Sequence, residues 1–123
     1  MKVIIFHGLG ASSNDNWFMW LKKELESKNI DVFVPNLPNS QNPKQEDWIK
    51  EALKLSINSD AILVGHSLGT ILIMRLLEKI KVKAAYLVSG FDEASELAIL
   101  DNFFEDKFNY DKIKSNVKNI TIL

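Results

Sequence analysis

Residues 65–69 read Gly-His-Ser-Leu-Gly, which places a serine between two glycines in the G-x-S-x-G spacing of a serine nucleophile. An apolar run at 61–64 precedes this motif and a second apolar run at 68–77 follows it, which predicts the strand, turn and helix that such a nucleophile needs. In that turn the serine hydroxyl lies at the N-terminus of the helix, where the helix dipole and free N–H groups favour developing negative charge. We therefore predict that Ser67 is a nucleophile and that the Leu68 N–H is one donor of an oxyanion hole.

The residues on either side of Ser67 are expected to support this turn. Gly65 and Gly69 keep neighbouring side chains from colliding with the strained backbone that the turn requires. His66 adjoins Ser67, but the turn points the two side chains apart. We therefore expect the His66 ring to pack beside the strand and not to act as a catalytic base.

A second loop with glycines follows the first predicted strand. It contains His7, Gly8, Leu9 and Gly10, and the two glycines allow the backbone to bend back toward the Ser67 hydroxyl. A backbone amide aimed from such a loop is the usual second oxyanion donor in this arrangement. The sequence therefore predicts that the Leu9 N–H completes the oxyanion hole.

The same glycines could instead begin a dinucleotide-binding fingerprint. However, Ser13 stands where the third glycine belongs, and Asn36 rather than an acidic residue follows the second predicted strand. A phosphate-binding loop ending in Gly-Lys-Ser is absent from the sequence. We expect no cofactor.

Composition and charge narrow the classes of protein to consider. The 123 residues are 46% hydrophobic and 25% charged, as in a single globular domain with a real core. A net charge of −1 with scattered basic residues predicts no nucleic-acid or membrane partner. The sequence has no cysteine, which excludes disulfides, zinc-thiolate sites and a cysteine nucleophile, so we expect no metal and a cytoplasmic location.

Short apolar runs alternate with helical patterns along the whole chain. Runs in which both faces are apolar predict buried parallel strands at residues 3–6, 32–34, 61–64, 84–88 and 120–123. Parallel neighbours need crossover helices between them. The sequence therefore predicts an α/β fold, a three-layer doubly wound parallel sheet of about five strands in a single domain at 1–123.

Amphipathic stripes place the helices between these strands. Trp17 and Trp48 each begin an apolar stripe at four-residue spacing, and we expect both rings to lie in the core. The polar stretch 12–16 is expected to supply capping side chains for the first helix. Residues 92–119 are more polar and carry four aromatic residues, which predicts one or two helices with an aromatic face.

Around these motifs the chain resembles the small α/β-hydrolases of the retinoblastoma-binding-protein-nine and YdeN-like serine hydrolase family. The residues that carry the resemblance are the 65–69 motif, His7-Gly8, Asn16-Trp17-Phe18, Trp20-Leu21, Pro35-Asn36-Leu37-Pro38-Asn39, Trp48 and Asp101-Asn102-Phe103-Phe104. The resemblance implies a serine hydrolase of the esterase type, acting on a small-molecule ester or amide.

The resemblance also implies an Asp and a His that complete the catalytic triad, at positions beyond residue 123. His7 and His66 are the only histidines, so residue-by-residue transfer yields a nucleophile and two oxyanion donors. Asp92 could mimic an earlier acid, but an acid without a histidine to orient is useless. Loss of the triad histidine costs a serine protease roughly a millionfold in rate, so we expect a nearly inactive chain. It is then a fragment, a disrupted gene product, or a domain repurposed for binding or interaction.

The family's strand order, 2-1-3-4-5, places the last predicted strand at an edge of the sheet. An open edge exposes unpaired backbone groups and invites pairing with another chain. We therefore expect self-association through residues 120–123. The same order reverses between the first and third strands, next to the Gly8 loop and Ser67, where ligands bind in open α/β sheets.

Overall fold

The computed structural model describes residues 1–91 and 97–123. It contains one five-stranded sheet whose pairings are all parallel and whose order is β2-β1-β3-β4-β5, which confirms the predicted fold class and strand order. The strands are β1 (Lys2–Phe6), β2 (Asp31–Phe33), β3 (Ile62–His66), β4 (Val82–Val88) and β5 (Val117–Ile122). The helices are α1 (Phe18–Glu26), α2 (Gln45–Leu53), α3 (Leu68–Leu77), the 3-10 helix η1 (Ala98–Phe103) and α4 (Tyr110–Ser115).

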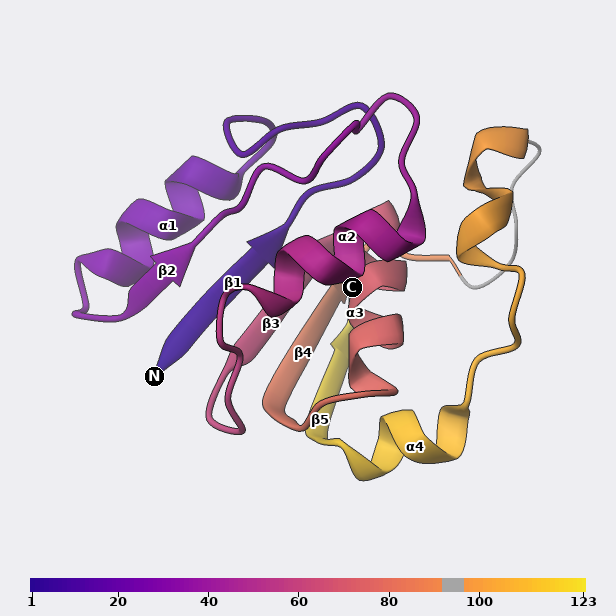
Figure 1. The fold of residues 1–123 in the computed structure, drawn as a ribbon. Helices are drawn as coiled ribbons and strands as arrows, with labels where there is room; N and C mark the ends of the chain where they lie inside the picture. The colour runs from indigo at the N-terminus through magenta and orange to yellow at the C-terminus, as the bar shows by residue number, and fades with distance from the viewer. Residues whose placement is uncertain (92–96) are drawn as a thin grey trace.

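The sheet separates two apolar clusters of unequal size. On one face Ile4, Phe6 and Leu63 pack with α2, α3 and α4, the side toward the viewer in Figure 1. On the other face Val3 and Ile5 pack with Phe18 of α1 and with the side chains of β2 and β3. Alternate residues of one strand thus face opposite layers, as a doubly wound sheet requires.

The start of α1 differs from the prediction. No side chain of residues 12–16 caps this helix, whose N-cap residue is Trp17. The Asp15 carboxylate instead accepts hydrogen bonds from the Ser12 N–H at 2.7 Å and from the Ser12 hydroxyl, so it closes the preceding turn. Trp17 is only half-buried and Phe18 fills the core in its place, whereas Trp48 is fully buried as predicted.

The region after β4 folds as two short helical turns, η1 and α4, on the side of the molecule far from α1 (Figure 1). Residues 92–96, including Asp92, lie outside the described residues. The expected aromatic face is present: Phe103 is fully buried, and the rings of Phe104 and Phe108 meet edge to face with centroids 6.1 Å apart. Among the described helices none is both long and apolar enough to cross a membrane.

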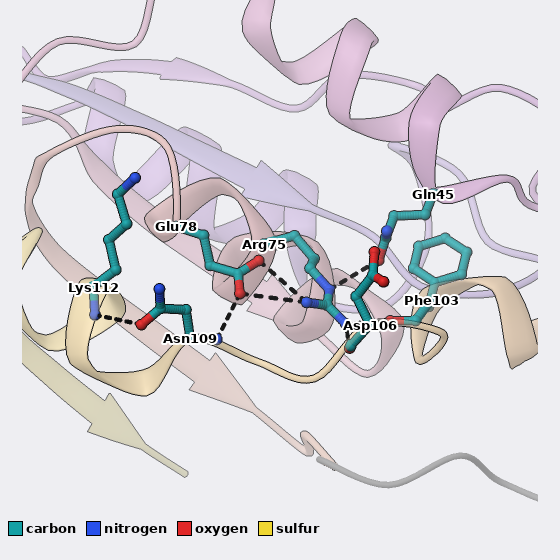
Figure 2. Close-up of polar contacts among 7 residues, drawn as sticks. All are labelled: Gln45, Arg75, Glu78, Phe103, Asp106, Asn109 and Lys112. Atoms are coloured by element: carbon teal, nitrogen blue, oxygen red, sulfur yellow. Dashed lines mark hydrogen bonds and ion pairs between the residues drawn. The ribbon is translucent and has the colours of Figure 1, made fainter.

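Arg75, the single arginine of the sequence, joins this region to α3 and α2 (Figure 2). Its guanidinium donates hydrogen bonds to the Gln45 side-chain oxygen at 3.0 Å and to the backbone oxygens of Phe103 and Asp106. It also pairs with Glu78 at 3.2 Å. Because Arg75 is only 4% exposed, these contacts replace the water that its charge has lost.

Candidate functional site

Ser67 lies at the turn between β3 and α3 in a conformation that L-residues rarely adopt, with φ 54° and ψ −118°. The surrounding backbone fixes this geometry, because the Ser67 N–H donates to Val88 O at 3.0 Å and its carbonyl accepts from Thr70 N and Thr70 Oγ1. A serine at a helix N-cap usually uses its hydroxyl to bind a backbone N–H. Among the described residues Ser67 makes no such capping bond, so its hydroxyl is not engaged by the helix that it begins.

The glycines around Ser67 allow three segments to meet at this point. A Cβ on Gly69 would lie 2.3 Å from Phe6 O, and a Cβ on Gly8 would lie 3.1 Å from the Ser67 Cβ. A Cβ on Gly65 would lie 2.7 Å from the carbonyl oxygen of Gly69. The structure therefore brings the Gly8 loop, the end of β3 and the first turn of α3 into direct contact.

The two predicted oxyanion donors directly follow residues of this contact in the sequence, since Leu9 follows Gly8 and Leu68 follows Ser67. Leu68 is the first residue of α3, where N–H groups have no intrahelical acceptor. Within residues 1–91 and 97–123, neither the Leu68 N–H nor the Leu9 N–H has a hydrogen-bond acceptor. Their assignment as donors to a reacting oxygen remains a prediction.

His7, the first residue of the loop at 7–10, is buried and holds a defined tautomer. The Leu37 N–H donates to His7 Nε2 at 2.8 Å, so the ring proton lies on Nδ1 and is donated to Gly8 O at 2.9 Å. Burial lowers the pKa of His7 below its usual value, which favours this neutral form. A trans peptide plane points its C=O and N–H in opposite directions, so the bond to Gly8 O also fixes the direction of the Leu9 N–H.

Further contacts tie the Gly8 loop to residues 36–41. The Gly10 N–H donates to Ser40 O at 2.7 Å, and the Ser13 N–H donates to the Asn36 side chain at 2.8 Å. Gly10 has a φ of 67°, a backbone conformation that glycine adopts without strain. The Trp48 indole in turn donates to Pro38 O at 2.8 Å. Residues that carry the family resemblance thus hold the loop beside Ser67.

His66 lies on the other side of the sheet from α3, against α1. Its ring meets those of Trp17 and Phe18 edge to face, each at a centroid distance of 5.9 Å. Its Nδ1 is buried and has no hydrogen-bond partner among the described residues. Because His7 uses both ring nitrogens on backbone groups, neither histidine is hydrogen-bonded to Ser67 in the described structure.

Sequence reasoning missed two residues that support the site. Thr70 holds the Ser67 carbonyl and closely contacts Gly90, where an added Cβ would lie 2.8 Å from Thr70 Oγ1. Arg75 holds the segment after β4 against the same helix. Arg75 could have been found from the sequence, because it is the one charged residue in the otherwise apolar run 68–77 and a buried charge needs partners.

Comparison with known proteins identifies the family of this chain. A family model described as serine hydrolase matches residues 3–120, so the chain belongs to the serine hydrolase family. The chain is 35% identical to the putative hydrolase YdeN of Bacillus subtilis over 130 aligned positions, which span 99% of this chain and 68% of YdeN. It is 28% identical to the serine hydrolase RBBP9 of Rattus norvegicus, over 97% of this chain and 67% of that protein.

The fold is shared as well. The crystal structure of the ydeN gene product superposes with a TM-score of 0.90 at 34% identity, covering 98% of this chain and 69% of that one. YdeN therefore contains the fold described above, and the remaining 31% of YdeN lies outside the match.

Proposed function

We propose that Ser67 is the nucleophile of an esterase-type serine hydrolase, for which residues 1–123 supply the nucleophile and the oxyanion hole. The observation that carries the proposal is the conformation of Ser67, strained at φ 54° with its hydroxyl free of capping and the Gly8 loop beside it. Family membership supports it independently. The substrate class is a small-molecule ester or amide.

In this reaction the Ser67 oxygen attacks the acyl carbon, and its proton passes to a base. The carbonyl oxygen becomes an oxyanion that the Leu9 and Leu68 N–H groups would stabilise, and one such donor is worth about 3–4 kcal/mol of barrier. The C–O or C–N bond to the leaving group then breaks as the leaving group takes the proton. Water, activated by the same base, hydrolyses the acyl-serine ester and restores the hydroxyl.

The described chain presents no base for these steps, because His7 is engaged by backbone groups and His66 packs against Trp17 and Phe18. We propose that the base comes from polypeptide outside residues 1–123. The same observation favours the second candidate, a non-catalytic α/β binding module that keeps the cleft without the chemistry. The absence of cysteine supports a cytoplasmic location for either.

Addition of an external base distinguishes the serine hydrolase from the non-catalytic binding module. We expect background labelling of the chain alone by a serine-directed fluorophosphonate at neutral pH, and slow labelling of Ser67 when imidazole is added at high concentration. Ser67→Ala should abolish the rescued labelling. Ser89→Ala is the matched control, since Ser89 also follows a strand with positive φ, 53°, and should leave labelling unchanged. No rescue by imidazole would favour the binding module.

A further inference from the structure

A hollow lies at the end of the sheet opposite to Ser67, where the strands begin. The loop before β3, the starts of β4 and β5 and the end of α4 meet there, toward the lower edge of Figure 1. The hollow has a volume of about 630 Å³, which is within the usual range of small-molecule sites. The five residues of β3 separate it from Ser67 by roughly 16 Å, at about 3.3 Å per residue. The hollow is therefore distinct from the proposed catalytic site.

The lining of this hollow carries three lysines and one acidic residue. Lys81, Lys83 and Lys118 are exposed, and within residues 1–91 and 97–123 none of their ammonium groups has an ion-pair partner. The Asp60 carboxylate lies 3.7 Å from the ammonium group of Met1 and is 62% exposed. Positive charge is therefore in excess in the hollow.

The fold places two of these lysines directly against each other. The parallel register that pairs Val82 of β4 with Val117 of β5 also sets the next residues, Lys83 and Lys118, opposite one another. Like charges at directly opposed positions of neighbouring strands repel each other and destabilise the pairing. A bound anion would remove this repulsion, because it would attract both ammonium groups.

The other polar groups of the lining suit an anion that accepts several hydrogen bonds. Each lysine ammonium carries three N–H donors, and the Ser59 hydroxyl has no hydrogen-bond partner in the described parts of the chain. Asn116 is not available in the same way, because its side-chain N–H donates to Leu77 O at 2.8 Å. Phosphate groups accept several hydrogen bonds at once, and lysine is a common phosphate ligand.

We infer that this hollow binds a small anionic ligand of the phosphate type that carries two or more negative charges. The inference goes beyond the proposed function, since no group of the ligand would reach Ser67. A ligand that binds the folded chain and not the unfolded chain raises the free energy of unfolding. The site would therefore couple the stability of the β4 and β5 pairing to the concentration of the anion.

The test is isothermal titration calorimetry with inorganic pyrophosphate at low ionic strength. We expect one site with a Kd of about 1 mM or lower, which weakens as salt is added. Backbone amide shifts in NMR spectra should change at residues 59–60, 81–83 and 115–118 and not at Ser67. Citrate at the same ionic strength compares a carboxylate anion with a phosphate anion and should bind more weakly.

Charge-removing variants provide the matched comparison. The double variant Lys83→Gln with Lys118→Gln should weaken pyrophosphate binding about tenfold, since each exposed pairing contributes up to about 1 kcal/mol. The double variant Lys23→Gln with Lys28→Gln removes the same charge from exposed positions outside the hollow and should change Kd by less than about twofold. Circular dichroism checks that each variant is folded.

Four results would overturn the inference. They are no binding of pyrophosphate, amide shifts spread over the whole surface, equal weakening by the two double variants, and binding of citrate as tight as that of pyrophosphate. Equal weakening would mean that only the net charge of the chain attracts the anion. None of these measurements uses the Ser67 hydroxyl, so their failure leaves the proposed function untouched.

Discussion

Replacement of Arg75 by methionine tests how the segment after β4 is held. The change removes hydrogen bonds to Gln45 Oε1 and to the carbonyls of Phe103 and Asp106, and it leaves Glu78 without its ion-pair partner (Figure 2). The Arg75 Cζ also lies 3.9 Å from the centroid of the Phe108 ring, a contact that methionine replaces only in part.

The expected cost follows from burial. Arg75 is 4% exposed, and breaking a buried ion pair from one side costs roughly 3–5 kcal/mol. Each buried carbonyl left without a donor contributes about 1–3 kcal/mol of that cost. For a domain of this size a loss of 3–5 kcal/mol lowers Tm by roughly 10–20 °C and removes a large part of a typical total stability.

Urea unfolding followed by tryptophan fluorescence and circular dichroism measures this loss. Lys79→Met, a charge removed from an exposed position at the end of the same helix, should change the free energy of unfolding by less than about 0.5 kcal/mol. The loss of unfolding free energy in Arg75→Lys should lie between those of Lys79→Met and Arg75→Met, because lysine keeps the charge but lacks the planar guanidinium with its several donors. A loss below about 1 kcal/mol for Arg75→Met would refute the view that Arg75 anchors this segment.

Three further predictions concern the site and the sheet edge. Burial lowers the pKa of His7, so below pH 6.5 the unfolded chain binds a proton that the folded chain does not bind. The free energy of unfolding should therefore fall from pH 7.5 to pH 5, and it should fall less steeply in His7→Phe. Urea unfolding at each pH measures this. Gly69→Ala should cost at least about 3 kcal/mol by urea unfolding, because its Cβ would lie 2.3 Å from Phe6 O, which is backbone and cannot swing aside. The chain should self-associate through residues 120–123, and Ile122→Lys, at a position 75% exposed, should reduce this in light scattering; a clean monomer at high concentration contradicts it.

The sequence predicted the sheet well where a strand is buried on both faces. Runs of β-branched residues marked β1 and β3, and the α3 helix has the bounds 68–77 that its apolar run predicted. The beginnings of β4 and β5 were placed too late, at residues 84 and 120 rather than Val82 and Val117. Lys83 and Lys118 are exposed, and strands with one solvated face do not show a continuous apolar run.

The position of Ser67 was also predictable, because strand, turn, glycines and helix are all local in sequence. The bonds that fix the loop beside it were not. The Leu37 N–H and His7 Nε2 are 30 residues apart, and the Gln45 and Arg75 side chains are also 30 apart. A local pattern shows that a buried charge or ring needs partners, while only the packed fold shows which residues supply them.

The central place of β1 in the sheet has a consequence for synthesis on the ribosome. Val3 pairs with Val32 on one side and with Ile62 on the other, so β1 needs partners from two later parts of the chain. At about 5–20 residues per second, the second partner emerges roughly 2–6 s after the first. During that interval one edge of an apolar strand is open, and closing it joins residues about 60 apart, which is slow for any parallel pairing. We therefore expect the nascent chain to be prone to aggregation until β3, the strand that leads to Ser67, pairs with β1.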